Sequence, residues 1–272
     1  MRPHESVFQK WRKPVIGMVH LLPLPGTEAY ARQGLGPVLD RALEEARLLD
    51  AGGVDAILLQ NTGDLPPRAE ERIETVAYMA AIGREMRNAV KCSLGINIMA
   101  NGTASALSVA HAIGADFVRI KIYVGAVISV GGVIHGSAPV ALAFRRHIEA
   151  PQIAIAADVY DRTSAALGNL SLELACDMAA RMGFADALVL TGQSVQDSLD
   201  RIRQIKVAMP RTVVLAGGGT TAENVHRFFE YGDGVIVGST IKDTGTFVGK
   251  VDSARLAVFM DAANLARNSI VD

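Results

Sequence analysis

The sequence predicts one α/β domain folded as a closed (β/α)8 barrel, and three observations lead to that prediction. Eight short runs of β-branched and other apolar residues alternate with eight helix-like amphipathic stretches. The runs are apolar on both sides, as expected of parallel strands that are covered on both faces. Several helix-to-strand joints carry the same small turn, in which glycine precedes aspartate. Eight strand–helix pairs in about 250 residues fit this barrel well.

Each element can be placed from its own residues. The expected strands are Val15–Val19, Ala56–Leu59, Ser93–Ile98, Phe117–Ile122, Ile153–Ala157, Ala187–Leu190, Val213–Ala216 and Val235–Val237. The expected helices are Pro37–Leu49, Ala69–Asn88, Thr103–Ile113, Val140–Glu149, Leu170–Met182, Val195–Val207, Ala222–Tyr231 and Ser253–Ala266. The alternative, an open doubly wound sheet, would usually show a glycine-rich fingerprint after the first strand, where this chain has a proline-rich segment. Residues 1–13 are an extension, and with no linker visible the whole of 1–272 is predicted to be a single domain.

Composition excludes several classes of protein. Half of the residues are apolar and 20% are charged, which excludes a disordered chain, a coiled coil and a collagen-like fibre. The formal net charge of −1 gives no general attraction to nucleic acid or anionic lipid. Cys92 and Cys176 lie far apart, which favours a reducing compartment and argues against a disulfide framework or zinc site. Because no export signal is visible in the first residues, a cytoplasmic location is expected.

One uncharged stretch, residues 124–144, is nominally long enough to cross a bilayer. Several glycines, His135 and Pro139 interrupt it, so it suits a lipid-exposed helix poorly and no integral membrane segment is predicted. We expect instead a long apolar loop near an active site or a subunit contact. Since exposed apolar segments of this length need cover, a homo-oligomer is also expected.

In a (β/α)8 barrel the loops after the strands build the functional site, so aspartates before strands (Asp116, Asp186, Asp233) are assigned to structural turns. The seventh and eighth strands both end in small residues. Glycines let backbone N–H groups approach an anion, a serine hydroxyl adds a donor, and a helix expected to begin near Ala222 adds a positive end. The two loops predict a phosphate site, and the alternative is two tight turns. The residues expected to hold the phosphate are Gly217, Gly218, Gly219, Gly238 and Ser239.

The fourth strand places two cations inside the barrel. Because side chains alternate along a strand, the odd-numbered residues of 117–122 face the interior and the even-numbered ones face the helices. Arg119 and Lys121 then lie near the mouth, where enclosed cations need anionic partners. Three interpretations stay open: recognition of a phosphate or carboxylate, an internal ion pair with Asp158, and a Schiff base on Lys121.

Other strand ends supply further candidates. Asp158 directly follows the fifth strand and is the first candidate for a general base, because a carboxylate near two cations stays ionised. His20 is either an acid–base group or a neutral histidine bonded to the backbone. No Walker-type loop, Ser/His/Asp order or His-rich cluster is present, so neither a cofactor nor a metal is predicted. A divalent cation on Asp64, Asp158 and Asp161 is the less favoured alternative.

The segment from Val15 to Gly26, Val-Ile-Gly-Met-Val-His-Leu-Leu-Pro-Leu-Pro-Gly, resembles the opening signature of the BtpA/SgcQ family. Matches continue along nearly the whole chain, including Gly95-Ile96-Asn97, Ala157-Asp158-Val159 and the segment 233–239. The resemblance implies a (β/α)8 TIM barrel of the phosphate-binding type. One branch of the family is associated with photosystem I biogenesis and others with sugar or nucleoside uptake, so it implies no single reaction. The residues carried over are His20, Asn61, Asn97, Arg119, Asp158, Thr191 and Ser239, of which Asn61, Asn97, Arg119 and Thr191 are assigned to substrate binding.

The chain departs from the family pattern at four positions. Gln60 stands where an acidic residue is common, and Gly102 stands where an aspartate is usual. Lys121 replaces a typical asparagine, and His135 replaces a common acid. Each change moves the mouth toward neutral or positive charge, so a metal or sugar site built on those acids in a relative need not be kept here.

Two functions of different classes follow from these residues. The first is an enzyme acting on a phosphorylated small molecule, such as a sugar phosphate or nucleotide-related compound, with Asp158, Lys121 and His20 as catalytic residues. Isomerase, lyase and hydrolase chemistry all fit. The second is a non-enzymatic assembly or stability factor for a membrane complex such as photosystem I, acting through residues 124–144. A barrel that binds a ligand without turnover is a third possibility.

Overall fold

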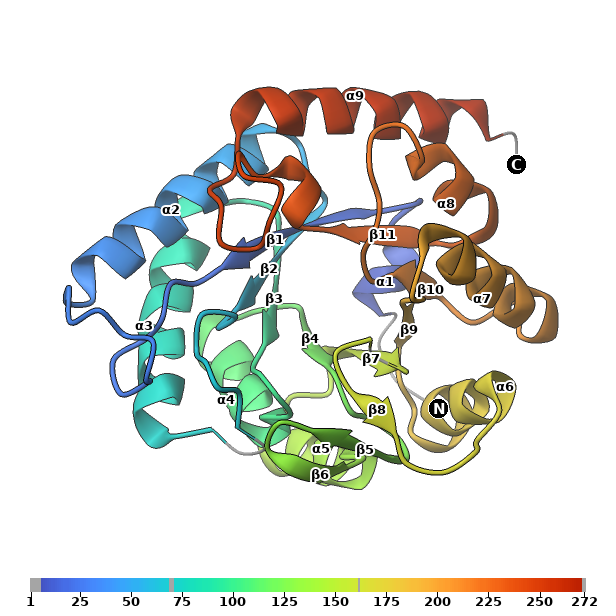
Figure 1. Ribbon diagram of the computed structural model, residues 1–272, viewed down its shortest axis with the longest axis horizontal. Helices are drawn as coiled ribbons and strands as arrows, with labels where there is room; N and C mark the ends of the chain where they lie inside the picture. Colours follow the sequence, from blue (N-terminus) through green and yellow to red (C-terminus); the bar gives the residue numbers. More distant parts are fainter. Residues whose placement is uncertain (1–5, 69–70, 161, 271–272) are drawn as a thin grey trace.

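The computed structural model describes residues 6–68, 71–160 and 162–270. Eight parallel strands close into a barrel in the order β1-β11-β10-β9-β7-β4-β3-β2 (Figure 1). The barrel strands are β1 (Val15–His20), β2 (Ala56–Gln60), β3 (Ser93–Asn97), β4 (Phe117–Ile120), β7 (Ala154–Val159), β9 (Ala187–Leu190), β10 (Val214–Ala216) and β11 (Gly234–Val237). The fold class is therefore confirmed, and each expected strand is present.

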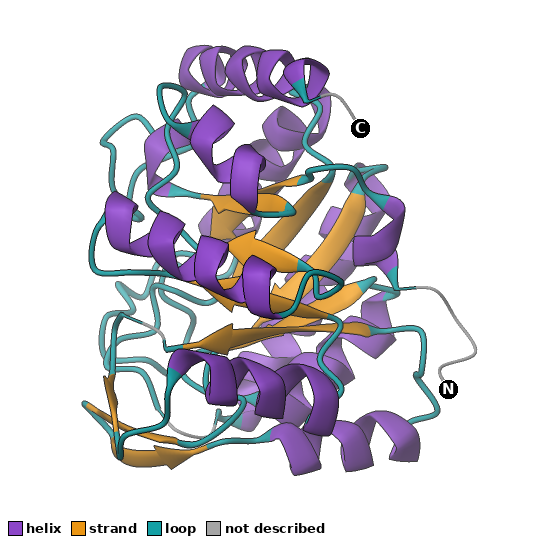
Figure 2. Ribbon diagram, turned by 90° about the vertical axis from the view of Figure 1, so that its right-hand side faces the viewer, coloured by secondary structure: helices purple, strands orange, loops and turns teal. Residues whose placement is uncertain are grey.

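Helices surround the barrel on its outside (Figures 1 and 2). They are α2 (Gly36–Ala51), α3 (Ile73–Ala89), α4 (Thr103–Ile113), α5 (Ala138–His147), α6 (Leu172–Asp177), α7 (Val195–Ala208), α8 (Val225–Tyr231) and α9 (Ser253–Ser269). A π-helical turn, Met178–Met182, extends α6. The expected start of the second helix at Ala69 lies outside the described residues. The helix expected from Ala222 begins later, because the side chain of Asn224 accepts a hydrogen bond from the Thr221 amide and closes a turn.

The N-terminal segment closes the barrel interior at the end where the strands begin. Helix α1 (Val7–Lys10) carries Phe8, whose ring lies 5.1 Å from that of Phe117, the first residue of β4. Trp11 packs edge-on against both rings. A Cβ at Gly95 would overlap the Phe117 ring, so glycine in β3 makes room for this aromatic plug. The alternation expected for β4 is confirmed, since Phe117 joins the interior core.

Four aspartates fasten neighbouring strands at the rim where the strands begin. Each directly precedes β2, β4, β9 or β11 and accepts a hydrogen bond of 2.7 to 2.9 Å from a backbone N–H near the start of the preceding barrel strand. The pairs are Asp55 with Val15, Asp116 with Leu94, Asp186 with Ile155, and Asp233 with Val214. The assignment of the Gly-Asp joints to structural turns is confirmed.

A cation from every second barrel helix completes each of these contacts. The ion pairs are Arg87 with Asp116, Arg145 with Asp186, Lys206 with Asp233, and Arg267 with Asp55. Each cation also donates to a backbone carbonyl just before β1, β3, β7 or β10. The rim where the strands begin, which we call the lower rim, therefore repeats one two-strand unit four times around the barrel. Each unit holds its own pair of neighbouring strands together.

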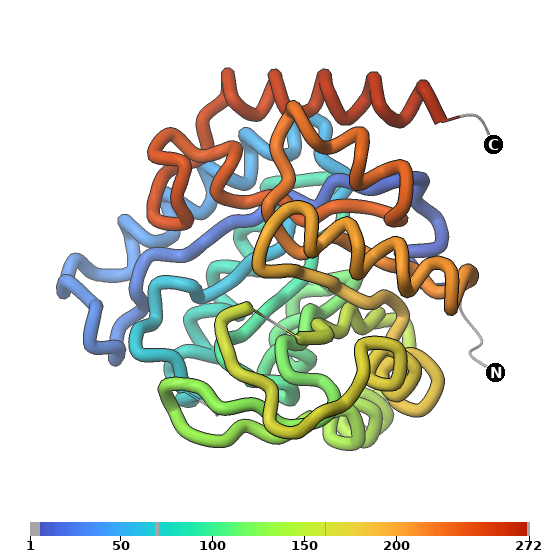
Figure 3. The backbone as a smooth tube through the Cα atoms, turned by 45° about the vertical axis from the view of Figure 1, so that its right-hand side comes forward, coloured from blue at the N-terminus to red at the C-terminus, as the bar shows by residue number. Residues whose placement is uncertain are grey.

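A small antiparallel sheet stands over the opposite rim. It consists of β6 (Gly132–His135), β5 (Ala126–Ser129) and β8 (Ala165–Ala166), in the order β6-β5-β8. Strands β5 and β6 form a hairpin, and β8 comes from a segment about 30 residues further along the chain. Figure 3 shows the hairpin and the β8 segment running over the same edge of the barrel. The expected apolar loop 124–144 is thus corrected to a β-hairpin followed by α5, because Gly132 adopts the positive φ of +97° that a tight turn requires. None of the helices in the described ranges is long and apolar enough to span a membrane.

Candidate functional site

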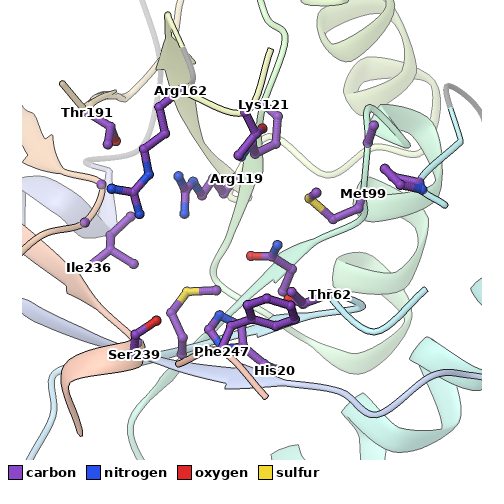
Figure 4. A pocket seen from close by; sticks show the side chains of 18 of the residues that line it. His20, Thr62, Met99, Arg119, Lys121, Arg162, Thr191, Ile236, Ser239 and Phe247 are labelled. Atoms are coloured by element: carbon purple, nitrogen blue, oxygen red, sulfur yellow. The ribbon is translucent and has the colours of Figure 1, made fainter. Parts of the chain in front are cut away.

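A cavity of about 580 Å³ opens at the rim where the strands end. Its walls come from the ends of most barrel strands, the β10 and β11 loops, and the three-stranded sheet above them. Within the described part of the chain, its charged lining residues are Arg119, Lys121 and Arg162 (Figure 4). No aspartate or glutamate of the described residues lines it. The cavity is therefore strongly electropositive and complements an anionic ligand.

Arg119 and Asp158 form a buried ion pair behind this wall. Arg119 Nε and Nη2 each donate to one oxygen of Asp158, both at 3.0 Å. Lys121 Nζ lies 4.0 Å from Asp158 Oδ2. The internal ion pair, one of three interpretations left open by the sequence, is thus present in this structure. It leaves Arg119 and Lys121 at the cavity surface, so it does not exclude a role for them in anion recognition.

Asp158 lies inside β7 rather than after it, because that strand continues to Val159. Its carboxylate faces a second, much smaller cavity that Lys121 also lines. Asp158 does not line the main cavity, so a ligand there has no direct contact with its carboxylate. Lys121 has direct access, because β4 ends at Ile120 and the lysine stands just beyond it. Ile122, expected to face the helices, instead packs beneath the hairpin for the same reason.

The loops after β10 and β11 form what we call the glycine cup, residues 217–220 and 238–240. In the described structure the backbone N–H groups of Gly218 and Gly219 donate to no other protein atom. A Cβ at Gly217 would collide with the Thr191 hydroxyl and would lie 3.4 Å from Arg119 Nη2. A Cβ at Gly218 would lie 3.5 Å from Arg162 Nη2. Two guanidinium groups therefore flank a loop whose amides are available to an oxyanion.

The helical end next to the cup differs from the one expected. Helix α8 begins only at Val225, whereas the short 3-10 helix Ser239–Ile241 starts at the cup itself. Thr191 and Ser239 both line the cavity, as expected. Arg162 was not anticipated from the sequence, because it stands in a loop with no periodic pattern; only its place a few residues after a barrel strand could have indicated it.

His20 lines the cavity as the last residue of β1. Burial, reinforced by the charge of Lys242, lowers the pKa of His20 to about 3. Lys242 lies outside the cavity wall, in a buried ion pair of 2.7 Å with Glu45. The imidazole is therefore neutral at physiological pH, and it can share a hydrogen bond with a ligand but cannot serve as a proton donor in the imidazolium form.

Buried polar atoms without a partner gather around this cavity. Six side-chain atoms of this kind occur among the residues that the structure describes, and four of them belong to residues of the cavity wall. The four are His20 Nδ1, Thr62 Oγ1, Ser164 Oγ and Thr220 Oγ1. Buried polar groups normally find a partner, so their concentration here is typical of a surface made for a polar ligand.

Two of the expected substrate-binding residues lie outside the cavity. The Asn61 side chain is fully buried and accepts a hydrogen bond from the Met99 amide while donating toward Asp64 and Glu71. Asn97 donates to the Arg119 carbonyl, at 2.8 Å. Both asparagines connect loops and strands at the mouth.

The carboxyl group of Glu71, next to Asn61, has a shifted pKa. Burial, with neighbouring Asp64 adding to it, raises the pKa of Glu71 to about 7 even though Asn61 donates to it.

The structure does not bring the possible cation ligands together. Asp64 accepts from the Leu24 amide and Asn61, whereas Asp158 accepts from Arg119. Asp161 lies outside the described residues. Among those that are described, no three His, Cys, Asp or Glu side chains could hold a metal ion. Of the four departures from the family pattern, Gln60 and Lys121 line the main cavity, whereas His135 is exposed on β6.

Fold and site together define a (β/α)8-barrel protein with one electropositive cavity at the carboxyl ends of its strands. The chain belongs to the BtpA family, whose sequence profile matches residues 11–265. It is 38% identical over 253 residues to an uncharacterized protein of Archaeoglobus fulgidus, covering 92% of this chain and 98% of the relative. Photosystem I biogenesis protein BtpA of Synechocystis is 34% identical over 262 residues, covering 94% and 91%. The putative sgc region protein SgcQ of Escherichia coli is 32% identical over 261 residues, covering 94% and 96%.

Solved structures with the same fold are far more distant in sequence. The native KDPGal structure has a TM-score of 0.59 at 15% identity and covers 95% of this chain and 98% of its own. N-(5'-phosphoribosyl)anthranilate isomerase from Pyrococcus furiosus has a TM-score of 0.58 at 13% identity, covering 93% and 99%. KGPDC from Streptococcus mutans has a TM-score of 0.59 at 12% identity, covering 94% and 99%. At these identities the likeness establishes the barrel fold alone.

Proposed function

We propose that this chain is an enzyme that acts on a phosphorylated small molecule. The observation that carries the proposal is the charge of the cavity wall, where the described residues include three cations and no carboxylate. Asp158 lies behind Arg119 and pairs with it, while the wall of described residues itself carries only cations. A phosphate monoester carries about −1.5 to −2 at pH 7, so it complements such a wall.

In the proposed complex the phosphate occupies the glycine cup. The amides of Gly218 and Gly219 and the hydroxyl of Ser239 donate to its oxygens, and Arg162 closes over it from the side. Backbone amides suit this task because they are fixed in place and need no reorientation when the anion arrives. A guanidinium adds charge-assisted hydrogen bonds, which are about twice as strong as neutral ones.

The proposed chemistry takes place next to Lys121. Its ammonium polarises a carbonyl or an ester oxygen of the substrate, and Asp158 stabilises the positive charge of Lys121 and Arg119. Asp158 is the proposed proton acceptor, while His20 orients a substrate hydroxyl as a neutral imidazole. Isomerase, lyase and hydrolase reactions all use a polarised oxygen and a mobile proton, so the site favours this group of reactions as a whole.

Calorimetry and a turnover screen test the proposal. Inorganic phosphate and ribose 5-phosphate should bind the purified protein, and a panel of phosphorylated compounds should contain a substrate. In Asp158→Asn and Lys121→Met, turnover of that substrate should fall by at least about a hundredfold, as for loss of an acid–base or polarising group. Phosphate affinity should persist in Asp158→Asn. Absence of binding by any phosphate ester would overturn the proposal.

One observation favours the second function, an assembly factor. The hairpin exposes Ile128 and Val133, and such a surface is suited to contact with another protein. A relative carries the name photosystem I biogenesis protein BtpA, which gives this alternative its partner class. If assembly is the function, Ile128→Asn should abolish it in cells, whereas Gly218→Ala should leave it intact. The enzyme proposal predicts the opposite pattern.

A further inference from the structure

The part of the cavity beneath the hairpin is lined by apolar residues. Ala100, Ile122, Val127 and Ile134 form a buried cluster that is separate from both the barrel interior and the helix layer. Three of these four side chains also line the main cavity, together with Met99 and Val130. The underside of the hairpin is therefore a small hydrophobic core with one face open to the ligand space.

The glycine cup and Met99 lie on opposite sides of the cavity. Figure 4 shows Ser239 and Thr191 on one side, Met99 on the other, and Arg119 and Lys121 between them. The lower wall between the two ends is polar, since His20 and Thr62 each hold a buried polar atom without a partner among the described residues. Apolar residues also occur on the cup side, where Ile236 lies, and beside His20, where Phe247 lies, but Met99 stands across the cavity from Ser239 and Thr191.

The volume makes the apolar end significant. At about 580 Å³ the cavity lies in the range occupied by drug-sized ligands, and a small sugar phosphate would leave much of it empty. Water would then contact the partly exposed Met99 and the small open faces of Ile122 and Ile134, and wetting apolar surface is unfavourable. A ligand that reaches the hairpin removes this surface from water.

From this geometry we infer that the substrate is a phosphorylated sugar carrying an aromatic or other apolar ring at the end remote from its phosphate. The phosphate binds the glycine cup, the sugar hydroxyls meet His20 and Thr62, and the ring packs beneath the hairpin against Met99 and Ile134. This inference rests on the proposed phosphate site and adds the substrate class. A nucleoside 5′-monophosphate has this arrangement of groups and serves as the probe.

Matched ligands separate the ring from the phosphate. Calorimetry compares inorganic phosphate, ribose 5-phosphate and adenosine 5′-monophosphate, the last two differing mainly by a ring on the sugar. Burying tens of Å² of ring surface should make the nucleotide bind about tenfold to a hundredfold more tightly than ribose 5-phosphate. Equal affinities of these two ligands would overturn the inference, while leaving the phosphate site intact.

Neighbouring residues of β6 supply the variant and its control. Ile134 is buried under the hairpin, whereas Val133 is exposed on its outer side. Ile134→Asn should reduce the preference for the nucleotide over ribose 5-phosphate about tenfold, and Val133→Asn should keep it. Met99→Gln, of similar size, should act like Ile134→Asn and provides the test if the latter folds poorly.

The pattern of losses tells the two proposals apart. Loss of nucleotide preference in Ile134→Asn, with ribose 5-phosphate still bound, supports the ring site. An unchanged preference in both Ile134→Asn and Met99→Gln overturns it, even when all three ligands bind. Failure of all three ligands to bind the unaltered protein overturns the phosphate site and the ring site together.

Discussion

Adding one methyl group to the glycine cup tests the phosphate site directly. The Cβ of Gly218→Ala would point toward the position of the Arg162 guanidinium, with Nη2 3.5 Å away as its nearest neighbour. Arg162 is exposed, the Cβ lies at an ordinary contact distance from it, and the φ of Gly218 lies outside the left-handed region, so alanine fits without strain on the backbone. We therefore expect the change in the free energy of unfolding to stay within about 1 kcal/mol.

The effect on binding should be much larger than the effect on folding. The methyl group occupies space that a phosphate oxygen needs in order to approach the Gly218 and Gly219 amides. Loss of one or two hydrogen bonds to a charged group amounts to about 1.5–3 kcal/mol, which corresponds to roughly 10- to 150-fold in Kd. Titration calorimetry with inorganic phosphate or ribose 5-phosphate measures this change, and thermal unfolding measures stability.

Other glycines provide the controls. Gly36 has open space around its Cβ position and no positive φ, so Gly36→Ala should alter neither binding nor stability appreciably. Gly217→Ala should destabilise the fold as well, because its Cβ collides with Thr191 and comes within 2.7 Å of Val189. If Gly218→Ala binds phosphate esters as tightly as the unaltered protein, the oxyanion does not occupy the cup.

Three further predictions concern pH and the lower rim. His20 stays neutral in the fold, with a pKa of about 3, but titrates near 6.5 when unfolded. Stability should therefore fall as pH drops below about 6.5, less steeply in His20→Gln, and parallel curves of Tm against pH would contradict this. Glu71 has its pKa raised to about 7, so its protonated form stabilises the fold at acidic pH and this contribution is lost as pH rises through 7. The Tm of Glu71→Gln relative to the unaltered protein should accordingly rise between pH 5 and 8, and a constant difference would refute the assignment. Asp186→Asn weakens the bond to the Ile155 amide and leaves Arg145 unpaired, which should cost about 1–3 kcal/mol, or several degrees in Tm, whereas exposed Asp40→Asn should be silent.

The barrel could be predicted from the sequence because its signals are local and repeated. Strands covered on both faces are apolar throughout, and the Gly-Asp joints recur at a regular spacing, so each repeat supports the others. The alternation along β4 also placed Arg119 and Lys121 at the interior. The prediction failed at Ile122, because β4 ends at Ile120 and side chains alternate between the two faces only within a strand.

The missed features depend on distant contacts. Nothing in the local pattern distinguishes a loop from the hairpin at 126–135, which is fixed by pairing with 165–166 and by packing on Ala100 and Ile122. Arg162 enters the site only because its loop passes over Gly218. Asn61 and Asn97 stand at strand ends, as ligand-binding residues do, yet their amides fasten the backbone of neighbouring strands and loops. The direction of the side chain decides whether such a residue binds a ligand or fastens the backbone. The spacing of residues in the sequence does not reveal that direction.

The two rims of the barrel use charge in opposite ways. At the lower rim each of four cations meets an aspartate, and each aspartate also accepts a backbone hydrogen bond, so the charges are balanced within the protein. At the mouth Arg119 has such a partner in Asp158, but the described cavity wall around it adds only cations. Cations that gather at the mouth of a cavity attract an anionic ligand, whereas the ion pairs of the lower rim hold strands together. A phosphate in the glycine cup is the ligand that the proposed function places beside these cations.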